Sequence, residues 1–146
     1  MIGGGVDLAS SPEDPALVED LIEAGGGILA EVAPGTPVRA QSLVARDRLQ
    51  SGLSVAVVVV QTDLASGTMH TVRFTVVQGR LLAAVRPPTG ERRWAGNAAL
   101  CSPEGCPPEA VHAGGAAAAA VAARRPLADL VLDGSDLSPL YRRLGL

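Results

Sequence analysis

The sequence contains no lysine, so its positive charge comes from 12 arginines. Aromatic residues make up only 2% of the chain, namely Phe74, Trp94 and Tyr141. Few rings are therefore present for the base stacking that many single-strand-binding proteins use. Cysteine is equally scarce, and Cys101 and Cys106 do not form a C-x-x-C pair. We therefore expect free thiols, with neither a disulfide framework nor a metal site.

Long apolar runs and a basic N-terminal segment are also lacking. No apolar run approaches the roughly 20 residues that span a bilayer, and "MIGGGVDLASSPED" does not have the basic start of a secretory signal. The 146 residues, 47% of them hydrophobic, suit one domain with its own core. We therefore expect a cytoplasmic protein with no membrane partner.

Charge is unevenly distributed along the chain. Residues 1–38 carry seven acids and no arginine, whereas residues 39–93 carry eight arginines against three acids. Residues 94–146 are nearly balanced. The basic middle third indicates a surface that attracts a polyanion. The alternative is a set of ordinary solvated arginines.

Apolar periodicity and turn residues predict alternating strands and helices over the first 86 residues. Expected strands are a stub at 1–2, Gly27–Val32, Val55–Gln61 and Leu81–Val85, and expected helices are the one from Pro15 to Gly25, capped by Asp14, that at 41–53 and Thr68–Gln78. A helical turn is expected at Gly96–Leu100, an Ala-rich helix near Ala116–Arg125, and a short helix in the last residues.

The segment Thr68–Gln78 decides the fold class. Its alternation of His70, Val72, Phe74 and Val76 favours a strand. However, Val55–Gln61 is apolar on both faces, which is typical of a parallel strand covered on both sides. Two parallel strands need a crossover connection, which is usually helical. We therefore predict a helix here, and an open parallel α/β sheet of about four strands with helices on both faces.

Ligands of such sheets bind beyond the carboxyl ends of the strands. The loop residues Ser66, Gly67 and Thr68 open a helix there and can bind a phosphate, although a simple N-cap at Ser66 is the alternative. Gly3, Gly4 and Gly5 form a tight turn that either approaches a phosphate or serves only the turn. Four arginines of the basic third complete the candidate set: Arg39, Arg46, Arg48 and Arg86. Because Arg46 and Arg48 lie on different faces of their helix, at most one should point to the ligand.

Several short motifs occur in a fixed order. They are Gly3-Gly4-Gly5-Val6-Asp7, Pro34-Gly35-Thr36, Arg46-Asp47-Arg48, Ser51-Gly52-Leu53-Ser54, Ser66-Gly67-Thr68, Gln78-Gly79-Arg80 and Ala95–Leu100. This ordered set resembles the DNA-processing protein A (DprA/Smf) family. Asp47 replaces the usual Asn, and the Gly-Ser-Arg strand and Ser-Gly-Gly-Ala motif of the family's N-terminal half have no counterpart. We therefore expect a partial family domain at 1–100, followed by a linker and helical extension at 101–146.

The resemblance implies a Rossmann-like fold that binds single-stranded DNA and helps to load a RecA-type recombinase, as in natural transformation. It implies no catalytic step and no cofactor. A truncated sheet would expose an edge strand. A homodimer, or pairing with a separately encoded N-terminal half, is therefore expected.

An enzyme of the lysine-decarboxylase-like (LOG) group is the main competing interpretation. Those phosphoribohydrolases carry a Gly-rich loop and a glutamate where this chain has "LASGTMHTV". Glycosidic hydrolysis needs a carboxylate near the sugar, but Thr71 takes that position and no acid lies between Thr68 and Glu91. A nucleotide-binding sensor or carrier without hydrolase activity remains open. A degenerate oligomerising fragment is the third interpretation.

Overall fold

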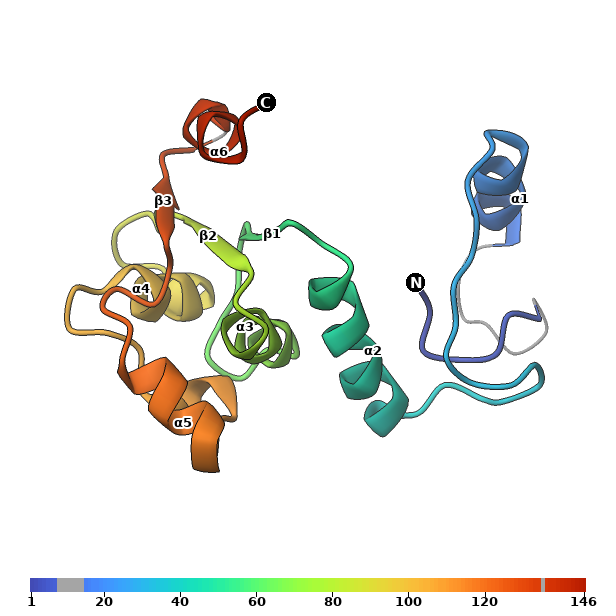
Figure 1. Ribbon diagram of the computed structural model, residues 1–146, viewed down its shortest axis with the longest axis horizontal. Helices are drawn as coiled ribbons and strands as arrows, with labels where there is room; N and C mark the ends of the chain where they lie inside the picture. The colour runs from blue at the N-terminus through green and yellow to red at the C-terminus, as the bar shows by residue number, and fades with distance from the viewer. Residues whose placement is uncertain (8–14, 135) are drawn as a thin grey trace. The chain divides into compact units, whose positions relative to one another are not determined.

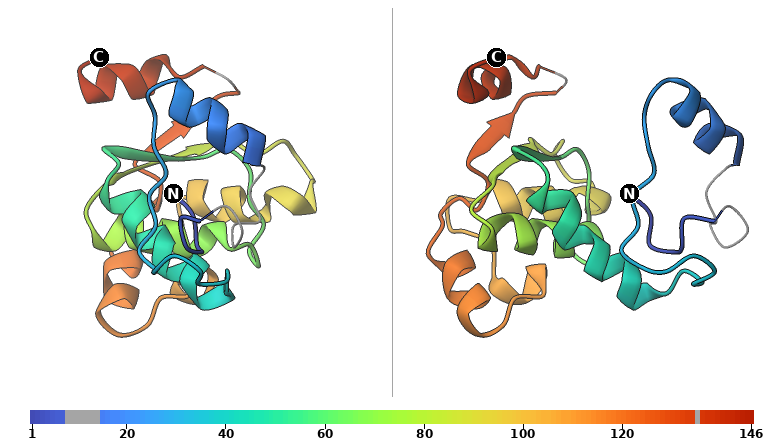
Figure 2. Two further views of the ribbon diagram at one scale, coloured as in Figure 1. Left: turned by 90° about the vertical axis from the view of Figure 1, so that its right-hand side faces the viewer. Right: turned by 45° about the vertical axis from the view of Figure 1, so that its right-hand side comes forward.

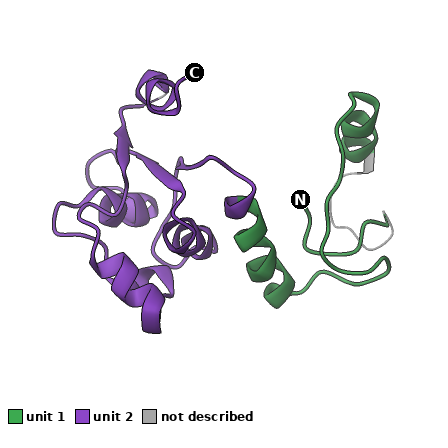
Figure 3. Cartoon of the chain, in the orientation of Figure 1, with its two compact units in different colours: residues 1–50 green, residues 51–146 purple. Residues whose placement is uncertain are grey.

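The computed structural model describes residues 1–7, 15–134 and 136–146, which form two compact units, Met1–Gln50 and Ser51–Leu146 (Figure 3). Figure 1 labels the α-helices and the strands. The elements are α1 (Pro15–Glu23), α2 (Ala40–Gly52), β1 (Ala56–Val59), α3 (Thr68–Val77), β2 (Leu81–Val85), η1 (Arg92–Trp94), α4 (Ala95–Cys101), η2 (Pro108–Val111), α5 (Gly115–Ala122), β3 (Leu130–Leu132) and α6 (Ser138–Leu144).

The first unit contains α1 and most of α2. Helix α1 ends as expected, because Gly25 adopts a φ of +82° that few other residues tolerate. The predicted cap Asp14 lies outside the described residues. Among the apolar residues of α1, Val18 is buried, whereas Leu17 and Ile22 are exposed.

The predictions of a strand at Gly27–Val32 and of a strand stub at 1–2 are wrong. Both segments are irregular, and they share one backbone hydrogen bond, from the Ile2 N–H to the Leu29 carbonyl at 3.0 Å. A strand needs a continuous ladder to a neighbour. Neither segment forms such a ladder with any residue that the structure describes.

The second unit holds an open parallel sheet in the order β1-β2-β3. Ala56 pairs with Leu81 at the start of β1, and Ala83 pairs with Leu130 at the start of β3. The parallel arrangement is therefore confirmed. The sheet has three strands instead of about four, because Gly27–Val32 is not one of them and Leu130–Leu132 joins from the C-terminal region.

The disputed segment between β1 and β2 is helix α3, as the crossover argument predicts. Its end is a Schellman motif in which Gly79, at φ +66°, donates to Val76 (3.1 Å) and Arg80 donates to Thr75 (2.9 Å). The chain therefore turns directly from α3 into β2. Tertiary topology here overrides the β propensity of a segment rich in Thr and Val.

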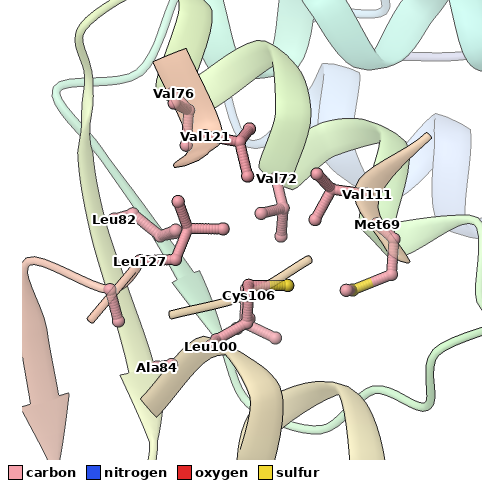
Figure 4. Packing of buried hydrophobic residues seen from close by; sticks show 12 residues of the cluster. Met69, Val72, Val76, Leu82, Ala84, Leu100, Cys106, Val111, Val121 and Leu127 are labelled. Atoms are coloured by element: carbon pink, nitrogen blue, oxygen red, sulfur yellow. The ribbon is translucent and has the colours of Figure 1, made fainter. Parts of the chain in front are cut away.

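The larger core lies between one face of the sheet and helices α3, α4 and α5 (Figures 1 and 4). Met69 and Val72 of α3, Leu82 of β2 and Leu100 of α4 are fully buried there. Val121 of α5 completes this layer. Full burial of each such side chain contributes roughly 1.5–3 kcal/mol, so this layer dominates the stability of the unit.

The opposite face of the sheet is covered by α6. Ala83 alternates with Leu82 along β2 and contacts this second layer, where Leu132 and Leu140 are buried. Figure 2 shows α6 and α5 on opposite sides of the strands. Helices thus lie on both faces, as predicted. The Ala-rich helix and the short C-terminal helix are present as α5 and α6.

Residues after 100 contribute β3, α5 and α6 to the second unit. The predicted division into a partial family domain at 1–100 and a linker with a helical extension at 101–146 stays a prediction. In the folded chain the later residues complete the sheet and both of its covering layers.

Candidate phosphate-binding site

The loop that follows β1 is fixed by one buried amide, Asn97 of α4. Its Oδ1 accepts the Thr62 N–H at 2.7 Å, and its Nδ2 lies 3.2 Å from the Val59 and Val60 carbonyls and 3.0 Å from the Val85 carbonyl. Asn97 therefore ties together the carboxyl ends of β1 and β2, the sheet end at which ligands of this fold class bind.

Gly96 brings α4 close enough for this contact. Its N–H donates to the Thr62 carbonyl at 3.0 Å. A Cβ at Gly96 would lie 2.5 Å from Thr62 Cγ2 and 2.8 Å from two loop carbonyls, so a larger residue would displace the loop. Sequence reasoning matched "AGNAAL" to a motif but gave neither residue a role. The adjacent Gly-Asn pair in an otherwise Ala-rich turn was the available signal.

The residues Ser66, Gly67 and Thr68 stand at the start of α3. The cap position is Gly67, and the helix has no side-chain cap; Ser66 Oγ instead accepts the Thr68 N–H at 3.3 Å and lies 3.2 Å from Thr68 Oγ1. A capping side chain accepts the N–H two or three residues further on, so this long contact is of the kind that the N-cap alternative at Ser66 predicts, and that alternative stays open. Gly67 is exposed with open space where a Cβ would stand, so an anion can approach the first turn and its partial positive charge.

One carboxylate belongs to the same loop. Asp63 is exposed, and its Oδ1 accepts the Ala65 N–H at 2.8 Å, which shapes the turn before Ser66. Its charge opposes an incoming anion. An arginine near this end of the sheet is therefore needed for net attraction.

Arg86 immediately follows β2, at the same end of the sheet. Its Nε lies 2.6 Å from Asp133 Oδ1, and the hydrogen bond and charge of Asp133 raise the pKa of Arg86. Both side chains are largely exposed, at 60% and 74%. Such a pair is weakened by solvent and salt, so a phosphate can compete with Asp133 for the guanidinium.

Gly3, Gly4 and Gly5 belong to the first unit and are buried. A Cβ at Gly3 would lie 2.6 Å from Leu43 Cδ2, and one at Gly5 would lie 2.6 Å from the Ala33 carbonyl oxygen. The Gly5 N–H also donates to the Thr36 carbonyl at 2.9 Å. Close packing against α2 and the loop at 33–36 accounts for two of these glycines without a ligand.

The three arginines of the first unit differ in their surroundings. The Arg46 side chain is 23% exposed, and its Nη2 lies 3.3 Å from Asp47 Oδ1. It lines a cavity of about 20 Å³, which holds no more than a water molecule. Arg48 pairs with Glu31. Arg39 is exposed, and Ser42 Oγ accepts its N–H at 3.0 Å at the start of α2.

The second unit therefore brings Ser66, Gly67, Thr68 and Arg86 to one end of the sheet. The other candidates, at positions 3–5, 39, 46 and 48, belong to the first unit. Their role toward a phosphate stays a prediction.

The cysteines and histidines form no metal site in the described part of the chain, where groups of three potential ligands are absent. Burial raises the pKa of Cys106 to about 11 and also raises that of Cys101. His70 stacks on His112 with ring centroids 4.1 Å apart. Within the described ranges, no helix is both long enough and apolar enough to cross a membrane.

Comparison with known proteins places these features in a family. Protein Smf of Escherichia coli (strain K12) is 33% identical over 90 residues, which is 62% of this chain and 24% of that protein. The chain thus matches about a quarter of its relative. The family model described as DNA recombination-mediator protein A matches residues 1–105, the range that contains Ser66–Thr68, Arg86 and the Gly96-Asn97 pair. The chain belongs to the DNA recombination-mediator protein A family.

Proposed function

We propose that this chain binds single-stranded DNA through phosphate contacts, as a non-catalytic component of DNA processing in the cytoplasm. One observation carries the proposal. The open first turn of α3 and the exposed Arg86 stand at the same end of a parallel sheet, and Asn97 bonds to both strand ends that position them. The name of the family supports DNA as the polyanion.

The contacts suit a phosphodiester without reading bases. A helix N-terminus offers N–H donors and partial positive charge, and a guanidinium offers two parallel donors to phosphate oxygens. Phosphate contacts position a strand but carry no sequence information. We therefore expect binding that depends strongly on salt and weakly on base sequence.

For glycosidic hydrolysis, the catalytic alternative, the sequence lacks the expected carboxylate. No acid lies between Thr68 and Glu91 in the sequence, and the nearest loop carboxylate, Asp63, accepts the Ala65 N–H and shapes the turn. The carboxylate that glycosidic hydrolysis requires is therefore missing from the position where the LOG-group enzymes carry it, because that position is Thr71 in this sequence.

Partners are part of the same proposal. Strand β1 lies at one edge of the sheet, and Val60, which follows it, is 64% exposed. An edge strand with apolar neighbours pairs readily with another chain. A second copy, or a separately encoded N-terminal half, would satisfy it, and a RecA-type recombinase is the candidate functional partner.

The test is fluorescence anisotropy of labelled oligo-dT at several salt concentrations. Wild-type affinity should fall steeply with salt, and Arg86→Ala should weaken binding and lower the slope of log K against log salt by about 0.7 for one lost phosphate contact. Arg142→Ala is the matched control, because it removes the same charge from exposed α6.

Two results would contradict the proposal. Absence of measurable binding at low salt would remove DNA as the ligand. Equal affinity for a mononucleotide and for an oligonucleotide would instead favour a nucleotide sensor. The double variant Arg39→Ala/Arg46→Ala tests the first unit in the same assay, and unchanged binding would assign the site to the second unit alone.

A further inference from the structure

An open basic groove of about 540 Å³ lies at the amino ends of the strands, opposite the end that carries Ser66–Thr68 and Arg86. Arg80, Arg124 and Arg143 line it, together with Asp129. These arginines come from three separate parts of the second unit: the turn before β2, the end of α5 and helix α6. None of the three belongs to the candidate phosphate-binding site.

The position of Arg80 is set by the backbone. The Schellman motif at Gly79 ends α3 and directs the chain into β2, so Arg80 stands where the strand begins. Its Nη2 donates to the Gly52 carbonyl at 2.6 Å. A guanidinium has five N–H donors and no acceptor, so this one bond leaves both charge and donors for a ligand.

Among the described residues that line the groove, the one carboxylate, that of Asp129, is already engaged. Asp129 Oδ2 accepts the Leu82 N–H at 2.8 Å, and Oδ1 accepts from Arg124. This arrangement neutralises one arginine and holds β2 against the segment before β3. Arg80 and Arg143 keep their charges, so the groove carries a net charge of about +2.

The groove also has apolar walls. Val55 is 70% exposed, and Val76 and Leu81 line the same space. Donor-only charged groups select an anion, and the apolar walls suit an uncharged portion of it such as a sugar. A nucleic acid strand offers both, with phosphates repeating along its length.

We propose that this groove is a second phosphate-binding site for single-stranded DNA, so that one strand contacts both ends of the sheet. This inference rests on the proposed function, because it assumes that the same strand occupies the Ser66–Thr68 end. A five-residue strand spans about 17 Å. A dinucleotide has one internal phosphate and therefore fills one site, whereas a long strand reaches both and gains affinity through effective concentration.

The experiment compares a labelled dT dinucleotide with oligo-dT of about 25 nucleotides by anisotropy. The proteins compared are wild type, Arg80→Gln/Arg143→Gln and the control Arg142→Gln. Arg142 is the neighbour of Arg143 on α6 but does not line the groove. The double variant should bind the long strand at least tenfold more weakly, and its salt slope should fall by about 1.4 for two lost phosphate contacts. The control should match wild type.

Arg143→Gln alone guards against a folding defect, because it leaves the bond from Arg80 to Gly52 intact. It should lower the salt slope by about 0.7. Circular dichroism checks that every variant is folded.

The outcomes separate the two proposals. If the variants keep wild-type affinity and slope for the long strand, the groove proposal is overturned and the proposed function stands. If these variants lose binding while Arg86→Ala binds like wild type, the groove proposal is supported and the site at the other end of the sheet is overturned. Absence of DNA binding by wild type overturns both, and binding of poly-glutamate that depends on Arg80 and Arg143 would assign the groove to an acidic protein segment.

Discussion

The two units of the chain bury their apolar side chains to very different extents. In the second unit, Met69, Val72 and Leu82 have no exposed surface. In α1 of the first unit, Leu17 is 53% exposed and Ile22 is 55% exposed. Ordered loops in the first unit depend instead on glycines packed against backbone and on single hydrogen bonds, such as that of Gly35 to Asp7 Oδ1 at 2.5 Å.

This difference indicates that the second unit contributes most of the free energy of unfolding. Hydrophobic burial is the largest favourable term in folding, and the second unit contains a three-layer arrangement that provides it. The described part of the first unit has backbone contacts but no comparable cluster of buried apolar residues. Substitutions of similar size should therefore have unequal effects in the two units.

Leu82→Ala should have the largest effect. Leu82 is fully buried between β2 and the helical layer, so its truncation removes burial and leaves a cavity, at a cost of roughly 2–5 kcal/mol. Urea denaturation followed by far-ultraviolet circular dichroism, which reports the helices of both units, measures the loss. Leu17→Ala is the matched control and should change the free energy of unfolding by less than about 0.5 kcal/mol. Equal losses would break the comparison between the units.

Asn97→Ala should have the second-largest effect on the free energy of unfolding. It removes the acceptor of the Thr62 N–H and the two N–H donors that the Val59, Val60 and Val85 carbonyls share, which should cost about 3 kcal/mol. The same denaturation assay applies, with the exposed Gln61→Ala as its control. Because Asn97 also positions the Ser66–Thr68 loop, DNA affinity should fall with stability. A variant of full stability would show that water replaces the amide.

The parallel sheet could be predicted from sequence because one observation constrains several others. A strand apolar on both faces implies parallel neighbours, and parallel neighbours require the crossover that is α3. That argument overrode the β propensity at His70–Val76 correctly. It depended on chain topology and not on any single residue.

Other features depend on contacts that a sequence does not display. The segment Gly27–Val32, expected as a strand, had suitable residues but forms no ladder with any of the residues that the structure describes. Strand β3 was missed because three apolar residues are too short a signal, and its pairing with β2 joins positions 47 residues apart, Ala83 and Leu130. The site shows the same limit: Ser66–Thr68 and Arg86 could be placed at one end of the sheet, whereas the clamp made by Asn97 is visible only in three dimensions.

Alkaline pH should produce the smallest of the three effects and sharpens the comparison further, because both cysteines belong to the second unit. Burial, and to a lesser degree the charge of Glu109, raise the pKa of Cys106 to about 11. The folded state therefore keeps a proton that the unfolded chain loses near pH 9, and this contribution to stability is fully present below that pH. It is lost between about pH 9 and 11, at a cost of roughly 1–2 kcal/mol.

Denaturation by urea at pH 8 and pH 10.5 measures this difference in the free energy of unfolding. Cys106→Ala should reduce the difference, while Cys101→Ala should largely preserve it. An unchanged pH dependence in Cys106→Ala would mean that another group carries the titration and that Cys106 is open to solvent in the folded unit.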